Sequence, residues 1–132
     1  MGSIRAVDTN ILARYVTADD AVQTPLATAI LASPCYVSDT VFLELAWLLS
    51  SRYRIPRADL AAILSDIVHL PTVTVSDSEL ILWATDRFAA GADFADMMHM
   101  ISGRSSDSFV SFEKELDILA GPDAPLPIER PI

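Results

Sequence analysis

The sequence has little basic charge and almost no capacity for disulfide bonds. Cys35 is the one cysteine among 132 residues, which excludes a disulfide framework and favours a reducing compartment. Asp and Glu number 18 against 9 Lys and Arg, a formal net charge of −9, and Lys114 is the one lysine. General nucleic-acid binding relies on a basic surface. Any contact with nucleic acid must therefore use a local basic edge or bound cations.

Long hydrophobic runs and targeting signals are also missing. The longest uncharged stretch, residues 21–38, contains Gln23, Pro25 and Pro34, which make it a poor membrane span. No apolar leader precedes Asp8, so we expect a cytoplasmic protein without a secretion signal or membrane contact. Hydrophobic residues nevertheless make up 52% of the chain, which excludes a disordered acidic chain and predicts one packed core.

Short β-branched runs alternate with amphipathic segments along the chain. We predict strands at residues 4–7, 35–37, 73–75 and 108–112, with an edge strand at 126–128. Helices are predicted over residues 11–16, 21–31, 41–50, 56–68, 78–90, 93–101 and 113–119. This alternation is typical of the α/β class, with a mainly parallel sheet and helices on both faces. Residues 1–120 are expected to form a single domain, and residues 121–132 a proline-rich tail.

Acidic residues follow several of the predicted strands. Asp8 ends the first strand, Asp39 follows the second, and Glu113 follows the fourth. Asp77 is placed similarly after the third. Ligand sites of open α/β sheets lie beyond the carboxyl ends of the strands, so one edge of the sheet is expected to carry several carboxylates. Their positions alone do not show which of these carboxylates form a functional site.

Glu44 is the most informative single residue. It is the one charge within residues 41–49, a segment that is otherwise apolar. We expect its carboxylate to be at least partly desolvated, and an unpaired buried charge costs several kcal/mol. Glu44 therefore requires a cation, a hydrogen-bond network or an arginine. A salt bridge to Arg14 or Arg52 is the structural alternative to a functional role.

Asp93 and Asp96 lie three residues apart near the predicted start of a helix. Capping and the helix dipole favour Asp there, which is sufficient to explain Asp93. Asp96 leads into the apolar residues 97–101 and is less easily explained. Converging carboxylates repel one another and raise one another's pKa unless a cation joins them. Oxygen ligands of this kind suit Mg²⁺ or Mn²⁺, which serve phosphate chemistry.

Other kinds of chemistry have weaker support. Cys35 is expected to be a small buried hydrophobe, and no glycine-rich phosphate loop is present. A phosphoacceptor domain is disfavoured because Thr9 and Asn10, and not a second acid, follow Asp8. Packing in the core or in an interface is expected for Met97, Met98, Met100, Trp47 and Trp83. A position in the core or at the surface is expected for His69 and His99.

Blocks of sequence that carry these acids occur in an order typical of one family. They resemble the PIN-domain ribonucleases, specifically the VapC-type toxins of bacterial toxin–antitoxin pairs. The resemblance extends from residue 4 to about residue 120. The blocks are Val7-Asp8-Thr9-Asn10-Ile11-Leu12, residues 38–49 with Glu44, residues 91–98, and Phe109-Val110-Ser111-Phe112-Glu113.

The resemblance implies a three-layer α/β/α fold and a Mg²⁺- or Mn²⁺-dependent endoribonuclease that leaves 5′-phosphate and 3′-hydroxyl ends. It implies that the catalytic, metal-binding acids are Asp8, Glu44, Asp96 and Glu113, with Asp93 as a companion ligand. Supporting polar positions are Thr9, Asn10 and Ser111. Candidate contacts to the RNA backbone, each also explicable as a solvated surface charge, are Arg14, Arg87, Arg104 and Lys114.

The resemblance also implies partners. VapC-type toxins bind a small VapB-type antitoxin and usually form homodimers, which implies a heterotetramer or larger assembly with the antitoxin. Glu113 stands where the family usually has Asp. That difference motivates an alternative function, a catalytically silent PIN-fold module that binds an antitoxin. Metal-dependent RNA cleavage separates the two.

Overall fold

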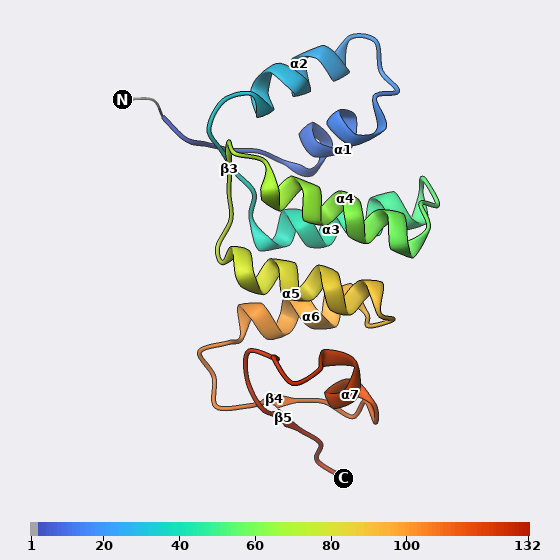
Figure 1. The fold of residues 1–132 in the computed structure, drawn as a ribbon, viewed down its shortest axis with the longest axis vertical. Coiled ribbons are helices and arrows are strands. Elements are labelled where there is room, and N and C mark those ends of the chain that lie inside the picture. Colours follow the sequence, from blue (N-terminus) through green and yellow to red (C-terminus); the bar gives the residue numbers. More distant parts are fainter. Residues whose placement is uncertain (1–2) are drawn as a thin grey trace.

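The computed structural model describes residues 3–132 as short strands interspersed with helices (Figure 1). The helices are α1 (Thr9–Thr17), α2 (Gln23–Leu31), α3 (Asp39–Ser51), α4 (Arg57–His69), α5 (Ser78–Ala89), α6 (Phe94–Ser102) and α7 (Leu116–Ala120). The strands are β1 (Arg5–Ala6), β2 (Cys35–Tyr36), β3 (Val73–Thr74), β4 (Phe109–Val110) and β5 (Ile128–Glu129). Every predicted element is present, with shifted ends. The α/β class is confirmed.

The described strands form two parallel sheets where the sequence predicts one. β2 lies between β1 and β3 in the first sheet, and β4 pairs with β5 in the second. In Figure 1, β3 of the first sheet lies in the upper half of the molecule below α2, and β4 and β5 lie near the C-terminal end, with α3 to α6 between them. Each strand has only two residues and forms few ladder hydrogen bonds. Packing between helices therefore supplies most of the core in place of a central sheet.

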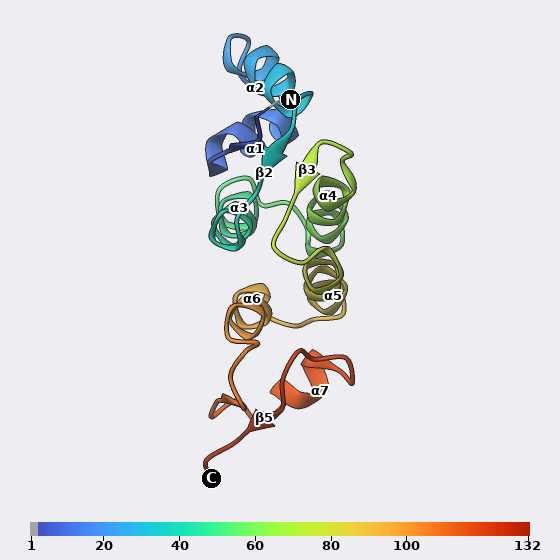
Figure 2. The ribbon, with the colours of Figure 1, turned by 90° about the vertical axis from the view of Figure 1, so that its left-hand side faces the viewer.

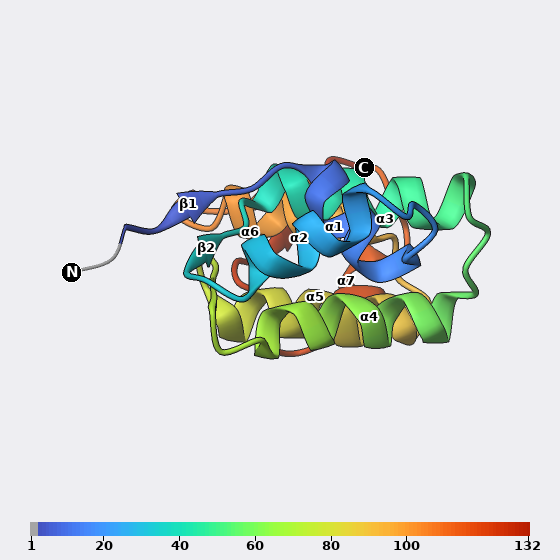
Figure 3. The same ribbon diagram turned by 90° about the horizontal axis from the view of Figure 1, so that it is seen from above.

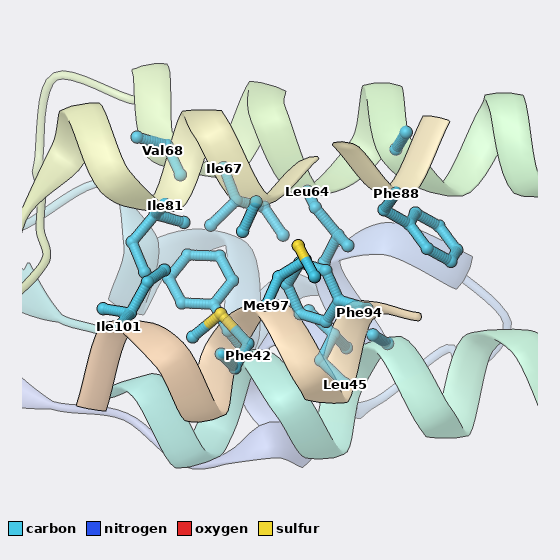
Figure 4. Packing of buried hydrophobic residues seen from close by; sticks show 14 of the residues in the cluster. Phe42, Leu45, Leu64, Ile67, Val68, Ile81, Phe88, Phe94, Met97 and Ile101 are labelled. Carbon is cyan, nitrogen blue, oxygen red and sulfur yellow. The ribbon is translucent and has the colours of Figure 1, made fainter. Parts of the chain in front are cut away.

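Four helices build that core. Seen along their axes, α3 and α6 lie on one side and α4 and α5 on the other (Figure 2). Side chains from both pairs meet between them, among them Phe42 and Leu45 of α3, Leu64 and Ile67 of α4, and Met97 of α6 (Figure 4). Each of these five is at most 2% exposed. Complete burial of a side chain of this size contributes about 1.5–3 kcal/mol.

Polar caps fix where the helices begin. Asp8, Ser38, Asp77 and Asp93 each accept a hydrogen bond from a backbone N–H in the first turn of α1, α3, α5 and α6, at 3.1–3.2 Å. Such a cap contributes about 1 kcal/mol. Gly91, with a φ of 118°, makes the turn from α5 into α6 in a conformation that a side chain would strain. These caps hold Asp8 and Asp93 in defined positions.

The expected packing residues lie in or against the core, except for one tryptophan. Cys35 is completely buried, and its thiol donates to the backbone carbonyls of Ile30 and Ser33. Trp47 is 61% exposed, so it does not pack into the core, and packing in an interface stays a prediction. Its helix α3 buries another face against α4 and α6, which leaves the indole at the surface. Buried as predicted are Met97, Met98 and Met100.

Candidate functional site

The carboxyl end of β1 leads directly into the first acidic segment. Asp8 is exposed and caps α1, its Oδ1 accepting from the Ile11 N–H at 3.2 Å. Thr9, the first residue of α1, is only 6% exposed. Its hydroxyl donates to Oε1 of Glu44 on α3. Figure 3, seen from the N-terminal end, shows α1 lying over α3, and the two helices pack together. The Thr9–Glu44 hydrogen bond thus connects two segments of the sequence whose functional residues were predicted independently.

Glu44 as a whole residue is exposed, while the hydrogen bond that its carboxylate accepts from Thr9 is partly buried. α3 buries Phe42, Leu45 and Leu49, while Glu44 and Trp47, three residues apart, share its exposed face. The alternative of a salt bridge to Arg14 or Arg52 is not observed. Within residues 3–132 the ion pair that forms joins Arg14 to Asp19 at 3.2 Å. Within residues 3–132 the hydrogen-bond partner of the Glu44 carboxylate is the Thr9 hydroxyl.

The start of α6 carries two of the predicted acids. Asp93 is exposed and caps the helix, its Oδ1 accepting from the Asp96 N–H at 3.1 Å. Asp96 is partly buried. Burial raises the pKa of Asp96 above its ordinary value, the negative charges of Asp93 and Glu113 raise it further, and His99 opposes the shift. The shift indicates that these carboxylates stand near enough to repel one another.

Glu113 comes from the last acidic block, after β4. It is exposed, and its backbone N–H donates to the Ser111 hydroxyl at 3.1 Å, so Ser111 shapes the turn that presents Glu113. Its charge acts on Asp96, as described above. The segment also exposes Phe112, at 72%. Ser111 contacts Glu113 through the backbone N–H of Glu113 rather than through its carboxylate.

Two adjoining hollows connect the acids of β1, α3 and α6. The larger, of about 630 Å³, is lined among others by Glu44, Trp47, Arg57 and Asp93. The smaller, of about 190 Å³, is lined by Asp8, Thr9, Asn10, Glu44, Trp47 and Leu48. Glu44 and Trp47 border both hollows, which we together call the acidic groove. Asn10 lies in the groove, as its predicted supporting role requires.

The donors of the groove have the chemistry of a hard-cation site. Within residues 3–132, no three His, Cys, Asp or Glu side chains stand close enough to hold one ion between them. Mg²⁺, however, commonly takes one or two carboxylates and keeps several waters or substrate phosphates. Exposed carboxylates such as Glu44 and Asp93 fit a partly hydrated ion of this kind. A cation beside Asp96 would also relieve the repulsion that raises the pKa of its carboxyl.

The predicted basic contacts lie outside the groove lining. Arg14 is paired with Asp19 and also donates to Gln23 at 2.8 Å. Arg87 donates to the Leu119 carbonyl at 2.7 Å, and Arg104 to the Ile101 carbonyl at 2.7 Å, so both arginines secure backbone near helix ends. Lys114 is exposed next to Glu113. The structure gives these arginines structural contacts and brings none of the four residues into the hollows.

Sequence reasoning missed the arginine that does line the groove. Arg57 opens α4, and its Nη1 donates to the backbone carbonyls of Phe88 and Ala92, both at 2.8 Å. Its guanidinium lies 4.5 Å from the centre of the Phe88 ring. These contacts fasten the turn that precedes Asp93. A positive side chain in the first turn of a helix is unfavourable, because the N-terminal end of the helix dipole is itself positive. This unfavourable position of Arg57 was the signal in the sequence that could have identified it.

Comparison with known proteins adds no assignment. The sequence matches no protein-family model and no curated protein sequence. Among the helices of residues 3–132, none combines the length and apolarity needed to cross a bilayer. The acidic groove and its residues are therefore the basis for proposing a function.

Proposed function

We propose that the protein is a Mg²⁺- or Mn²⁺-dependent endoribonuclease of the PIN type, acting as the toxin of a toxin–antitoxin pair. The observation that carries the proposal is the joining of separate acidic segments: Asp8 and Glu44 border one hollow, and Glu44 and Asp93 border the next. The charges of Asp93 and Glu113 both act on Asp96. These acids are the ones on which the family resemblance depends.

Several of the chain's own residues hold the acids in position. Thr9 orients the Glu44 carboxylate through its hydroxyl, and the caps of α1 and α6 hold Asp8 and Asp93. By the resemblance, the acids that would hold divalent cations are Asp8, Glu44, Asp93, Asp96 and Glu113. Because no three of them within residues 3–132 stand close enough to share one ion, each ion would take one or two of these carboxylates and keep several waters. When bound, such an ion activates water near neutral pH and neutralises charge on phosphate oxygens. With a net charge of −9, the protein needs that positive charge to approach RNA.

The finer parts of the proposal rest on the resemblance. They are a three-layer α/β/α arrangement, a homodimer, a VapB-type antitoxin as partner, and a cytoplasmic location. The described strands form two sheets. The fold therefore supports the proposal at the level of the α/β class, and the acidic groove supports the proposed activity.

Cleavage of RNA by antitoxin-free protein tests the proposal. The protein is incubated with total RNA in Mg²⁺, in Mn²⁺ or in EDTA, and the ends of the products are mapped. We expect cutting with either metal, no cutting in EDTA, and products with 5′-phosphate and 3′-hydroxyl ends. Cutting that persists in EDTA, or products ending in a 2′,3′-cyclic phosphate, would contradict the proposed chemistry.

The second candidate function is a silent PIN-fold module that binds an antitoxin. Glu113 favours it, because it occupies the position where the family usually has the shorter Asp. This candidate predicts that no RNA is cut under any metal, while an antitoxin is still bound. The same cleavage assay therefore separates the two candidates.

A further inference from the structure

The acidic groove contains an exposed tryptophan for which the cleavage chemistry has no use. Trp47 is 61% exposed and borders both hollows beside Glu44. Exposure of so large an apolar surface to water is unfavourable by about 25 cal/mol per Å². Trp83, by comparison, is partly buried and donates its indole N–H to the Ala120 carbonyl at 3.0 Å. Trp47 presents a flat aromatic surface at the centre of the groove.

Arg57 supplies a fixed positive group in the larger hollow. Its Nη1 makes both hydrogen bonds to the turn carbonyls, and its guanidinium rests over Phe88. No hydrogen bond to another of residues 3–132 involves its Nε or Nη2, so those N–H groups are free to meet a ligand. Arginine held in this way is well suited to a phosphate group.

We propose that the larger hollow is a subsite for one unpaired nucleotide of the RNA substrate. The base stacks on the Trp47 indole, and Arg57 donates to a backbone phosphate. The neighbouring phosphodiester is thereby placed beside Glu44 and the other acids. A hollow of about 630 Å³ lies within the usual range of ligand sites, ~300–1,000 Å³. This inference rests on the proposed function and specifies its substrate class.

Stacking on Trp47 selects single strands. In a duplex, both faces of each base are already covered by neighbouring bases, and proteins that read bases by stacking act on unpaired segments. The subsite therefore restricts cleavage to loops, bulges and single-stranded ends. An A-form helix has no free base surface to offer to Trp47.

The mixed surroundings of Trp47 favour RNA over a protein partner. The charged Glu44 and Asp93 line the same hollow as the apolar Leu43, Phe88 and Phe94. The centre of a protein–protein interface is depleted in charged residues, whereas a nucleotide presents both an apolar base face and a charged phosphate. A stacked base beside a hydrated cation matches this mixture.

Fluorescence of Trp47 provides the test. The chain has two tryptophans, so Trp83→Phe leaves Trp47 as its only indole. Asp8→Asn is added to keep the RNA intact, which electrophoresis of the RNA after each titration verifies. A single-stranded RNA octamer of mixed sequence is titrated in Mg²⁺ buffer. The same strand annealed to its complement is titrated in parallel.

We expect saturable quenching of Trp47 by the single strand and at least about tenfold weaker binding of the duplex. In anisotropy measurements with labelled RNA, Trp47→Leu weakens binding about 5- to 100-fold, whereas Trp47→Phe keeps most of the affinity. Arg57→Met lowers the salt slope of binding by about 0.7, the value for one phosphate contact on a single strand. Arg57→Lys retains that slope because it retains the charge.

Several results overturn the subsite. Equal quenching by the duplex does so, as does wild-type affinity in Trp47→Leu. If light scattering shows that Trp47→Leu converts a dimer to a monomer with unchanged RNA affinity, Trp47 belongs to an interface between copies. The proposed function fails separately: if the wild type cuts no RNA with any metal while single strands still quench Trp47, the subsite stands and the ribonuclease does not. Conversely, an unchanged KM for cleavage in Trp47→Leu removes the subsite alone.

Discussion

Glu44 shows, at the scale of single residues, what a sequence pattern conveys and what it leaves out. Its isolation among apolar residues correctly marked it as unusual. Glu44 is more exposed than its apolar neighbours suggest because the exposed face of α3 also carries Trp47, a residue for which sequence predicts packing in the core or in an interface. Burial depends on which faces neighbouring helices cover. The Thr9 contact likewise depends on how α1 crosses α3.

Glu44→Gln tests whether the carboxylate is functional. Because Glu44 is exposed and Gln retains an oxygen that accepts from Thr9, we expect the free energy of unfolding in EDTA to change by no more than about 0.5 kcal/mol. We expect RNA cleavage to be lost. Urea denaturation and the cleavage assay measure the two quantities. Full activity in this variant would remove Glu44 from the site.

Thr9→Val tests the bond that orients Glu44. Loss of the hydroxyl is expected to cost about 1 kcal/mol of stability and to reduce cleavage about tenfold, as for other residues that position a metal ligand. Thr85→Val is the matched control, because Thr85 is 1% exposed and its hydroxyl donates to the Leu82 carbonyl on α5. It is expected to cost similar stability with unchanged activity. Equal loss of activity in both variants would show that Thr9 acts only through stability.

At the scale of elements, local rules identified nearly every helix and strand. Cap residues and glycines placed the starts of α3, α5 and α6 within two residues of the observed ones. α7 begins at Leu116 rather than residue 113, because residues 111–113 form the turn that Ser111 stabilises. The charge environment at the start of α6 was predicted in part. The spacing placed Asp93 and Asp96 together, but the nearness of Glu113 arises from tertiary structure.

Asp96→Asn tests that charge environment in the absence of metal. Because the pKa of Asp96 is raised in the folded state, the folded protein binds the proton more tightly than the unfolded chain. Stability therefore falls as the pH rises from about 3.9, the ordinary value for Asp, through the raised pKa, and stays lower at neutral pH. Asp96→Asn is expected to gain stability at pH 7, by less than about 1 kcal/mol after solvent screening, and to lose cleavage.

Urea denaturation in EDTA at pH 7 and at about pH 3.9, the ordinary value for Asp, measures this gain, which should shrink at the lower pH. Asp93→Asn is a companion variant that removes the charge of Asp93 and keeps its helix cap, because Asn caps a helix about as well as Asp. A loss of stability in Asp96→Asn at pH 7 would contradict the assigned repulsion.

At the scale of the whole molecule, the sequence predicted the α/β class and not the pairing of its strands. A two-residue strand contains little information about its neighbour, and register in a parallel sheet depends on the helices that cross over it. The cluster formed by α3, α4, α5 and α6 determines where the strands lie. The groove depends on the same packing, since its walls come from α1, α3, α4, the end of α5 and the start of α6.

A matched pair of capping aspartates tests the central claim most directly. Asp8 and Asp77 both cap helices, but only Asp8 lines the acidic groove, and Asn preserves a cap at either position. Cleavage of RNA in Mg²⁺ is compared for the wild type, Asp8→Asn and Asp77→Asn, with folding checked by circular dichroism. We predict that Asp8→Asn abolishes cutting while Asp77→Asn retains it. Equal cutting by Asp8→Asn and the wild type would contradict the metal-dependent ribonuclease.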